Sequence, residues 1–211
     1  MGILEAVAKK KNKAEALAKR VIGNPGSLSE LLDGISSEKA GIKFKSAKIL
    51  RIISEERPEL LYPKWDFFEK LLGSKNNIIK WNVMDVIANL TRVDSRNRFD
   101  KMFGKFYGML NEGSLITAAH VIENSWKIAK AKPGLSSRIT NELLKVEKIQ
   151  LPTDECRNIL KGQAILSFSE YFGQIKEKGK VISFAKRELK NSRRSTRSKA
   201  VKFLKKFEGR K

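Results

Sequence analysis

Basic side chains near the C-terminal end are the residues in this sequence with the most distinctive chemistry. Residues 176–211 carry fifteen Lys or Arg and three Glu, a net +12 of the +21 of the whole 211-residue chain. Clustered cations bind phosphates, release the counterions of a polyanion and speed the encounter with it. The candidate polyanion-binding residues are Arg193, Arg194, Arg197, Lys199, Lys202, Lys205 and Lys206.

A second set of basic residues recurs at a nearly regular distance. Each opens a similar phrase of nine residues, and a fifth phrase without the cation begins at Thr117. The starts lie 35, 37, 44 and 36 residues apart. Such a row of cations either follows a nucleic-acid backbone or pairs with turn residues of neighbouring repeats as a structural ladder. Its members are Lys45, Lys80, Lys161 and Arg197.

Trp81 and Asp85 are four residues apart, so they lie on one face of the same helix. In the simplest interpretation Trp81 packs and Asp85 is a surface carboxylate. His120 is the only histidine and has no cysteine or carboxylate motif beside it, which favours a structural role. The sequence has no glycine-rich nucleotide loop, metal motif or nucleophile elbow. We therefore expect no cofactor, no metal and no small-molecule substrate.

Helical hairpins are the elements that must position these residues. Between Pro58 and Val93, apolar residues recur at steps of three and four, interrupted by Gly73 and a short polar turn. This spacing predicts two antiparallel helices in about 35 residues, a length typical of internal repeats. The first apolar stripe is Leu60, Leu61, Trp65, Phe68, Leu71 and Leu72, and the second is Ile79, Val83, Val86, Ile87 and Leu90.

The five nine-residue phrases predict five such hairpins. The fifth position of every phrase is apolar, and a hairpin cannot bury its apolar face alone, so neighbouring hairpins must stack. No alternation typical of strands is present. We expect the five residues to be buried in successive layers: Ile49, Met84, Val121, Ile165 and Val201.

The hairpin resembles those of HEAT and HEAT-like repeat proteins. Pro63 stands where the HEAT pattern often has a proline that bends the first helix, and Lys80 opens the second helix, where the pattern prefers a basic residue. The aspartate of the turn is replaced by Asn76 or Asn77. The resemblance implies an all-α fold: a right-handed, armadillo-like α-solenoid (an α-α superhelix) of about five hairpins plus an N-terminal capping helix.

We expect a single domain over residues 1–211. Residues 1–26 would form the cap, with one helix over 3–22 whose stripe Lys9 to Lys11 interrupt. Ser27 and Glu30 fit a capping box for the next helix, and Asp94 is positioned to cap a helix that runs to residue 111. The expected repeats are 27–57, 58–93, 94–133, 134–173 and 174–211.

The run Trp81-x-x-x-Asp85-x-Ile87-Ala88 is similar to one in alkylpurine DNA glycosylases built from HEAT-like repeats. In those enzymes the tryptophan and a catalytic aspartate have this spacing, and an arginine of the next repeat also faces the lesion. The matching region here, Thr117 to His120, contains no arginine. The resemblance thus implies a glycosylase site that lacks its arginine.

Composition narrows the function classes. A hydrophobic content of 41% fits a folded protein, and no stretch approaches the roughly 20 apolar residues that span a bilayer. A single cysteine, Cys156, and the lack of a secretory signal pattern favour the cytoplasm. A terminal repeat also needs a polar outer face for solubility, but Glu would serve equally well.

We expect a non-enzymatic protein that binds DNA or RNA through a basic surface. The first alternative is a protein–protein scaffold with an acidic partner, and the second is a DNA glycosylase.

The protein should not release alkylated bases from DNA, because the arginine partner of the aspartate is missing. Incubation with alkylated duplex DNA, followed by detection of free bases, checks this. Excision that is lost in Asp85→Asn would contradict it and make the glycosylase the first hypothesis.

Overall fold

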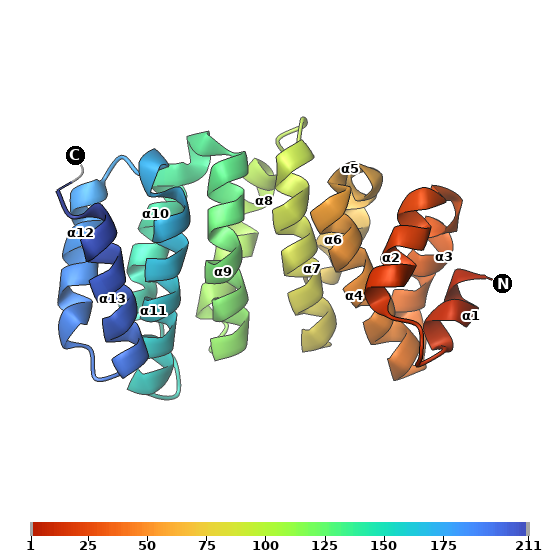
Figure 1. The fold of residues 1–211 in the computed structure, drawn as a ribbon, viewed down its shortest axis with the longest axis horizontal. Coiled ribbons are helices and arrows are strands. Elements are labelled where there is room, and N and C mark those ends of the chain that lie inside the picture. The colour runs from red at the N-terminus through yellow and green to blue at the C-terminus, as the bar shows by residue number, and fades with distance from the viewer. Residues whose placement is uncertain (1, 210–211) are drawn as a thin grey trace. The chain divides into compact units, whose positions relative to one another are not determined.

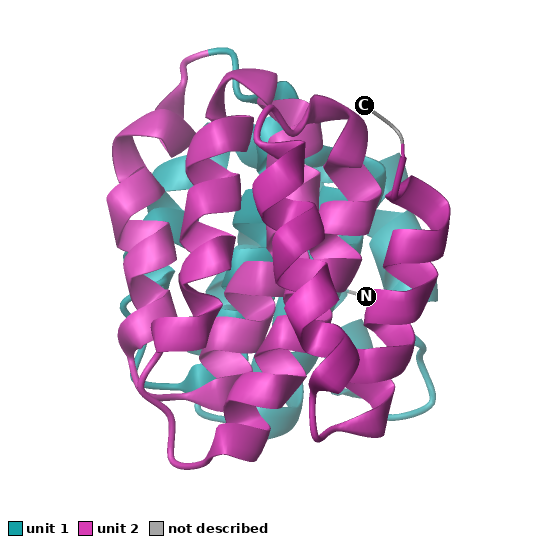
Figure 2. Ribbon diagram, turned by 90° about the vertical axis from the view of Figure 1, so that its left-hand side faces the viewer, with its two compact units in different colours: residues 1–95 teal, residues 96–211 magenta. Residues whose placement is uncertain are grey.

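The computed structural model describes residues 2–209, which form helices and turns without a β-strand. Judged by its internal contacts, the chain divides into two compact units, residues 1–95 and 96–211 (Figure 2). Each unit is a stack of helical hairpins, so the predicted all-α solenoid is confirmed (Figure 1). Among the described residues, no helix combines the length and apolar character needed to cross a membrane.

In the N-terminal unit, the second helices of successive hairpins lie in a row: α4 packs against α2 on one side and α7 on the other. The first helix of the central hairpin is divided into α5 and α6 by a 3-10 turn over Tyr62–Lys64, so Pro63 bends it as predicted. The helices are α1 (Ile3–Ala8), α2 (Ala14–Gly23), α3 (Leu28–Asp33), α4 (Ala40–Glu56), α5 (Pro58–Leu61), α6 (Trp65–Leu71) and α7 (Asn77–Leu90).

In the C-terminal unit, α11 lies between α9 and α13 and packs against both (Figure 1). These three are the second helices of their hairpins, and α8, α10 and α12 are the first helices. Their bounds are α8 (Arg98–Gly108), α9 (Leu115–Ala131), α10 (Ser136–Leu144), α11 (Asp154–Tyr171), α12 (Lys178–Arg187) and α13 (Arg194–Phe207).

The N-terminal segment is a short hairpin, so the prediction of one helix over 3–22 is wrong. The chain leaves the helical conformation at Lys9, where ψ is 115°. The side-chain amide of Asn12 donates to the Ala6 carbonyl at 2.8 Å, satisfying one of the free carbonyls at the end of α1. The break lets both α1 and α2 pack against α4. Burial of two short apolar faces thus outweighs the continuity of one helix.

Glu30 caps a helix distant in sequence instead of its own. Its carboxylate accepts hydrogen bonds from the backbone nitrogens of Ile3 and Leu4, each at 3.1 Å. These are free donors of the first turn of α1, where a negative charge is stabilising. The Ser27 hydroxyl donates to the Asn24 carbonyl. The predicted capping box between Ser27 and Glu30 is therefore wrong.

Asp94 contacts the hairpin before it. Its carboxylate is buried and accepts a hydrogen bond from the Tyr62 hydroxyl at 2.8 Å. The next helix, α8, begins four residues later, after Asn97 in a left-handed conformation with φ of 50°. The prediction that Asp94 caps this helix is wrong, because the residue at the cap position is Asn97.

Four of the five residues predicted in successive layers are buried: Ile49, Met84 and Val121 are 0% exposed and Ile165 is 1% exposed. Val201 is 53% exposed, so its prediction is wrong. Among the described residues α13 packs mainly against α11, α12 and the turn that precedes it. It therefore buries one stripe, whereas α11 buries both sides. The buried stripe of α13 is Thr196, Ala200, Phe203, Leu204 and Phe207.

Gly162 sets how closely α11 and α13 approach. A methyl group added at Gly162 would lie 2.7 Å from the Thr196 hydroxyl oxygen, well inside contact distance. Thr196 cannot easily yield, because it is buried and its hydroxyl donates to the Asn158 carbonyl at 2.7 Å. The glycine thus exchanges intrinsic helix stability for close packing.

Gly162→Ala should lower the free energy of unfolding by about 1–2 kcal/mol, because overpacking exceeds the gain in helix propensity. Gly104→Ala is the matched control: Gly104 is also helical, but nothing lies within 4 Å of an added methyl group. The control should raise stability by up to about 1 kcal/mol. Urea unfolding of both variants checks this, and equal stabilisation would show that α11 and α13 tolerate a wider separation.

Candidate functional site

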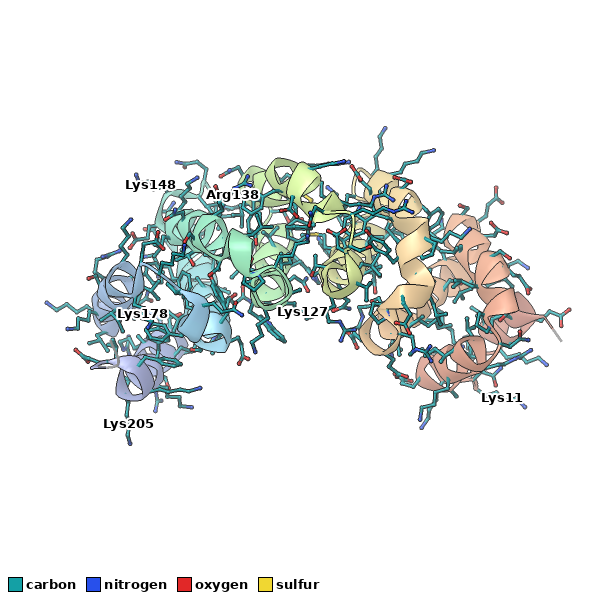
Figure 3. The ribbon with its side chains drawn as sticks, turned by 90° about the horizontal axis from the view of Figure 1, so that it is seen from above. Lys11, Lys127, Arg138, Lys148, Lys178 and Lys205 are labelled. Carbon is teal, nitrogen blue, oxygen red and sulfur yellow. The ribbon has the colours of Figure 1, made fainter. Side chains whose placement is uncertain are left out.

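Helix α13 carries a one-sided cationic face. Its sequence, RSTRSKAVKFLKKF, contains six basic residues and no acidic one. The helical period turns the apolar stripe toward α11 and α12 and leaves Arg194, Lys202, Lys205 and Lys206 exposed. Figure 3 shows Lys205 projecting away from the helices of this unit. We call these four residues the basic face of α13.

The charges of the basic face are not neutralised within residues 2–209. None of its four cations forms an ion pair there, and the carboxylate of Glu208 is used by Lys186 at 2.7 Å. The Lys206 ammonium lies 4.9 Å from the centre of the Phe207 ring, a cation–π contact that leaves its charge available. The face therefore retains the field that attracts a polyanion.

Arg193 and Arg197, two other candidates, hold the turn before α13. The Arg193 guanidinium pairs with the Glu155 carboxylate. Arg197 donates to the backbone carbonyls of Asn191 and Ser192 at 2.6 and 2.8 Å. Both cations thus have structural partners, and Arg210 and Lys211, which add to the C-terminal charge, lie outside the described residues.

Lys199 lies against α11 rather than in open solvent. A methyl group added at Gly162 would be 3.3 Å from its Cδ and 3.5 Å from its Nζ. Burial lowers the pKa of Lys199, the nearby Arg193 cation lowers it further, and Glu123 raises it. An ammonium that has lost part of its hydration beside another cation gains from an incoming anion.

Two members of the repeated row of cations form ties between hairpins. Lys45 of α4 donates to the Lys9 carbonyl at 2.8 Å, in the turn between α1 and α2. Lys161 of α11 pairs at 3.2 Å with the carboxylate of Glu188, which is 2% exposed at the end of the next hairpin's first helix. These contacts fit a structural ladder. Lys80, on α7, is half-buried.

Trp81 and Asp85, the low-ranked catalytic candidates, are both half-buried on α7 in the N-terminal unit. His120 is half-buried on α9 in the C-terminal unit.

A groove of about 420 Å³ lies between α9 and α11, and the sequence did not predict it. Trp126 falls on the apolar stripe of α9, which by itself favours the core, yet it is half-buried and lines the groove. The Gln163 amide nitrogen donates to Glu123 at 2.7 Å across the two helices. The lining residues are Glu123, Trp126, Gln163, Leu166, Ser167, Ser169 and Glu170.

Comparison with known proteins supports the fold. No family model matches the sequence, and no curated protein matches it. A designed armadillo repeat protein in complex with the peptide (KR)4 has a TM-score of 0.59 and 14% identity, with 97% of this chain and 98% of that chain covered. An engineered protein has a TM-score of 0.60 and 14% identity, with 96% and 86% covered. A second designed armadillo repeat protein has a TM-score of 0.56 and 13% identity, with 96% and 97% covered.

This chain is therefore similar to armadillo-like helical repeat solenoids in fold. The similarity to glycosylases has no counterpart among these structures.

Lys161→Met should lower the free energy of unfolding by about 3 kcal/mol, because it leaves the buried Glu188 carboxylate without its cation. Arg194→Met, at an exposed cation without an ion pair among the described residues, should change it by less than about 0.5 kcal/mol. Urea unfolding measures both. A small change in the free energy of unfolding for Lys161→Met would contradict the structural ladder, and Lys161 would then remain a candidate polyanion-binding residue.

Proposed function

We propose that this protein is a non-enzymatic binding scaffold that holds nucleic acid on the basic face of α13. The observation that carries the proposal is a helix of fourteen residues with six cations, no carboxylate and a buried stripe that faces the neighbouring helices. Exposed cations without neutralising partners bind the phosphates of a nucleic acid whatever its base sequence, because each contact releases condensed counterions. The positive charge of the basic face favours a polyanion, and contacts to phosphates imply little sequence preference.

Cations outside α13 also lie on the side of the C-terminal unit that carries the basic face. In Figure 3, Lys127 of α9 projects on the same side of this unit as Lys205, while Arg138 and Lys148 project on the opposite side. Lys199, with its partly desolvated ammonium, lies between the exposed cations of α13 and helix α11. We infer that a phosphate chain follows α13 and turns toward α11.

A protein partner is the second candidate. The designed armadillo repeat protein that is similar in fold is in complex with the peptide (KR)4. A chain of net charge +21 repels a cationic peptide from α13 and attracts an acidic one. Under this alternative an acidic protein segment takes the place of the phosphates.

Binding to nucleic acid should weaken steeply with salt. If four to six phosphates are contacted, affinity should fall by about three to five decades for a tenfold rise in salt concentration. Replacing Arg194, Lys202, Lys205 and Lys206 with Gln should weaken binding and reduce that slope by about three. The apolar stripe is untouched, so the thermal unfolding midpoint should stay within a few degrees. Fluorescence anisotropy at a series of salt concentrations measures the slope.

The matched control changes the same number of charges elsewhere in the C-terminal unit. Lys101, Lys148, Lys176 and Lys180 are exposed and have no ion pair among the described residues; their Gln variant should bind nearly as well as wild type. Equal losses in both variants would show a general charge effect and overturn the assignment to α13. Absence of binding at low salt, together with binding of a polyglutamate peptide, would favour the acidic protein partner.

A further inference from the structure

The groove between α9 and α11 offers a flat aromatic surface, and α13 packs against the same helix α11. Trp126 is half-buried on its α9 side, and Leu166, on its α11 side, is 49% exposed. An indole ring and a large aliphatic side chain together form a surface on which a planar ring stacks. At about 420 Å³ the groove has room for one heterocyclic base.

Two polar atoms of the groove have no partner among the described residues. Ser167 is 2% exposed, and its hydroxyl oxygen makes no hydrogen bond. The Gln163 side-chain oxygen is also buried without a partner, although the nitrogen of the same amide donates to Glu123. Buried polar atoms are normally satisfied, and exceptions call for a ligand or another cause. Here both residues line a groove.

Acceptors predominate around the groove. Glu123 and Glu170 contribute carboxylates from α9 and α11. The Lys130 ammonium already uses one of them: its Nζ lies 3.1 Å from Glu170 Oε2 and 4.7 Å from the centre of the Trp126 ring. Lys130 thus shows that a nitrogen donor can lie over the indole ring and bind the neighbouring carboxylate at the same time. Both side chains of that ion pair are about half exposed, so a ligand can displace it.

The groove lies near Lys199, a candidate phosphate-binding cation. Lys199 lies over Gly162, the residue directly before Gln163 on α11. Burial and Arg193 lower the pKa of Lys199, and the negative charge of Glu123, on the α9 wall of the groove, partly offsets this by raising it. A phosphate held by Lys199 would therefore lie on the α11 side of α13, next to a residue that precedes the groove lining.

We propose that the groove receives one unpaired base of a single-stranded nucleic acid whose phosphates lie along α13. This inference rests on the proposed function and narrows it to single strands, because bases in a duplex are already paired and stacked. The acceptors favour bases with an exocyclic amino group, such as cytosine, whose N4 donates to a carboxylate. Thymine presents a carbonyl oxygen at the same position, so Glu123 and Glu170 repel it.

Decamers of deoxycytidine and thymidine test the base preference, since the two bases are similar in size. Wild type should bind the cytidine decamer about tenfold more tightly at equal salt. In Glu123→Gln combined with Glu170→Gln, both affinities should rise because negative charge is lost, but their ratio should approach one. The four-Gln variant of α13 should weaken both decamers and keep the ratio. A ratio of one in wild type, or a ratio unchanged in the double variant, overturns the inference.

Quenching of tryptophan fluorescence is a second measurement, and it does not depend on charge alone. The cytidine decamer should quench part of the tryptophan emission, and that part should vanish in Trp126→Phe. Strong binding to α13 without this quenching overturns the groove proposal and leaves the proposed function standing. Quenching by an arginine peptide but not by the decamer would assign the groove to a cationic protein segment and also overturn the proposal. No binding of either decamer at low salt contradicts the proposed function itself.

Discussion

The structure depends on one constraint: a helical hairpin of this length cannot bury its apolar face alone. Burial of that face supplies most of the stability of such a fold, so a second helix inside the stack is covered on both sides by its neighbours. In the C-terminal unit α11 meets this demand between α9 and α13. The approach of α11 and α13 is close enough that only a glycine fits at residue 162. Helix α13 buries one stripe among the described residues, and that difference leaves a face for other uses.

The basic residues divide into two groups as a consequence of this packing. Those near turns and helix contacts are used internally: Lys45 binds a carbonyl of the hairpin before it, and Lys161 pairs with buried Glu188 of the hairpin after it. Arg197 braces the turn before its own helix. The cations on the outer side of α13 have no such role within residues 2–209. The sign of the net charge is therefore less informative than the place where charge stays uncompensated.

The groove between α9 and α11 arises from the stacking of two helices rather than from a sequence motif. It places carboxylates and an indole along α11, the helix against which the strongly basic α13 packs. Under our proposal this arrangement suits a ligand with both phosphates and hydrogen-bond donors. Its polar atoms without partners, Ser167 Oγ and Gln163 Oε1, are the feature that packing alone does not explain. Under the proposed function, such a surface would combine a sequence-independent electrostatic contact along α13 with stacking of a base in the groove.

The sequence by itself determined the helical class, the central hairpin between Pro58 and Val93, the bend at Pro63 and the burial of Ile49, Met84, Val121 and Ile165, because periodicity and proline geometry act over a few residues. Only the tertiary structure decided which partner each polar group uses. Glu30 caps a helix 26 residues earlier, and Asp94 receives a tyrosine hydroxyl 32 residues away. Val201 follows the apolar pattern and is exposed, and Trp126 follows it and lines a groove. Local patterns state which residues prefer burial, but the neighbouring hairpins decide which side of each helix is covered.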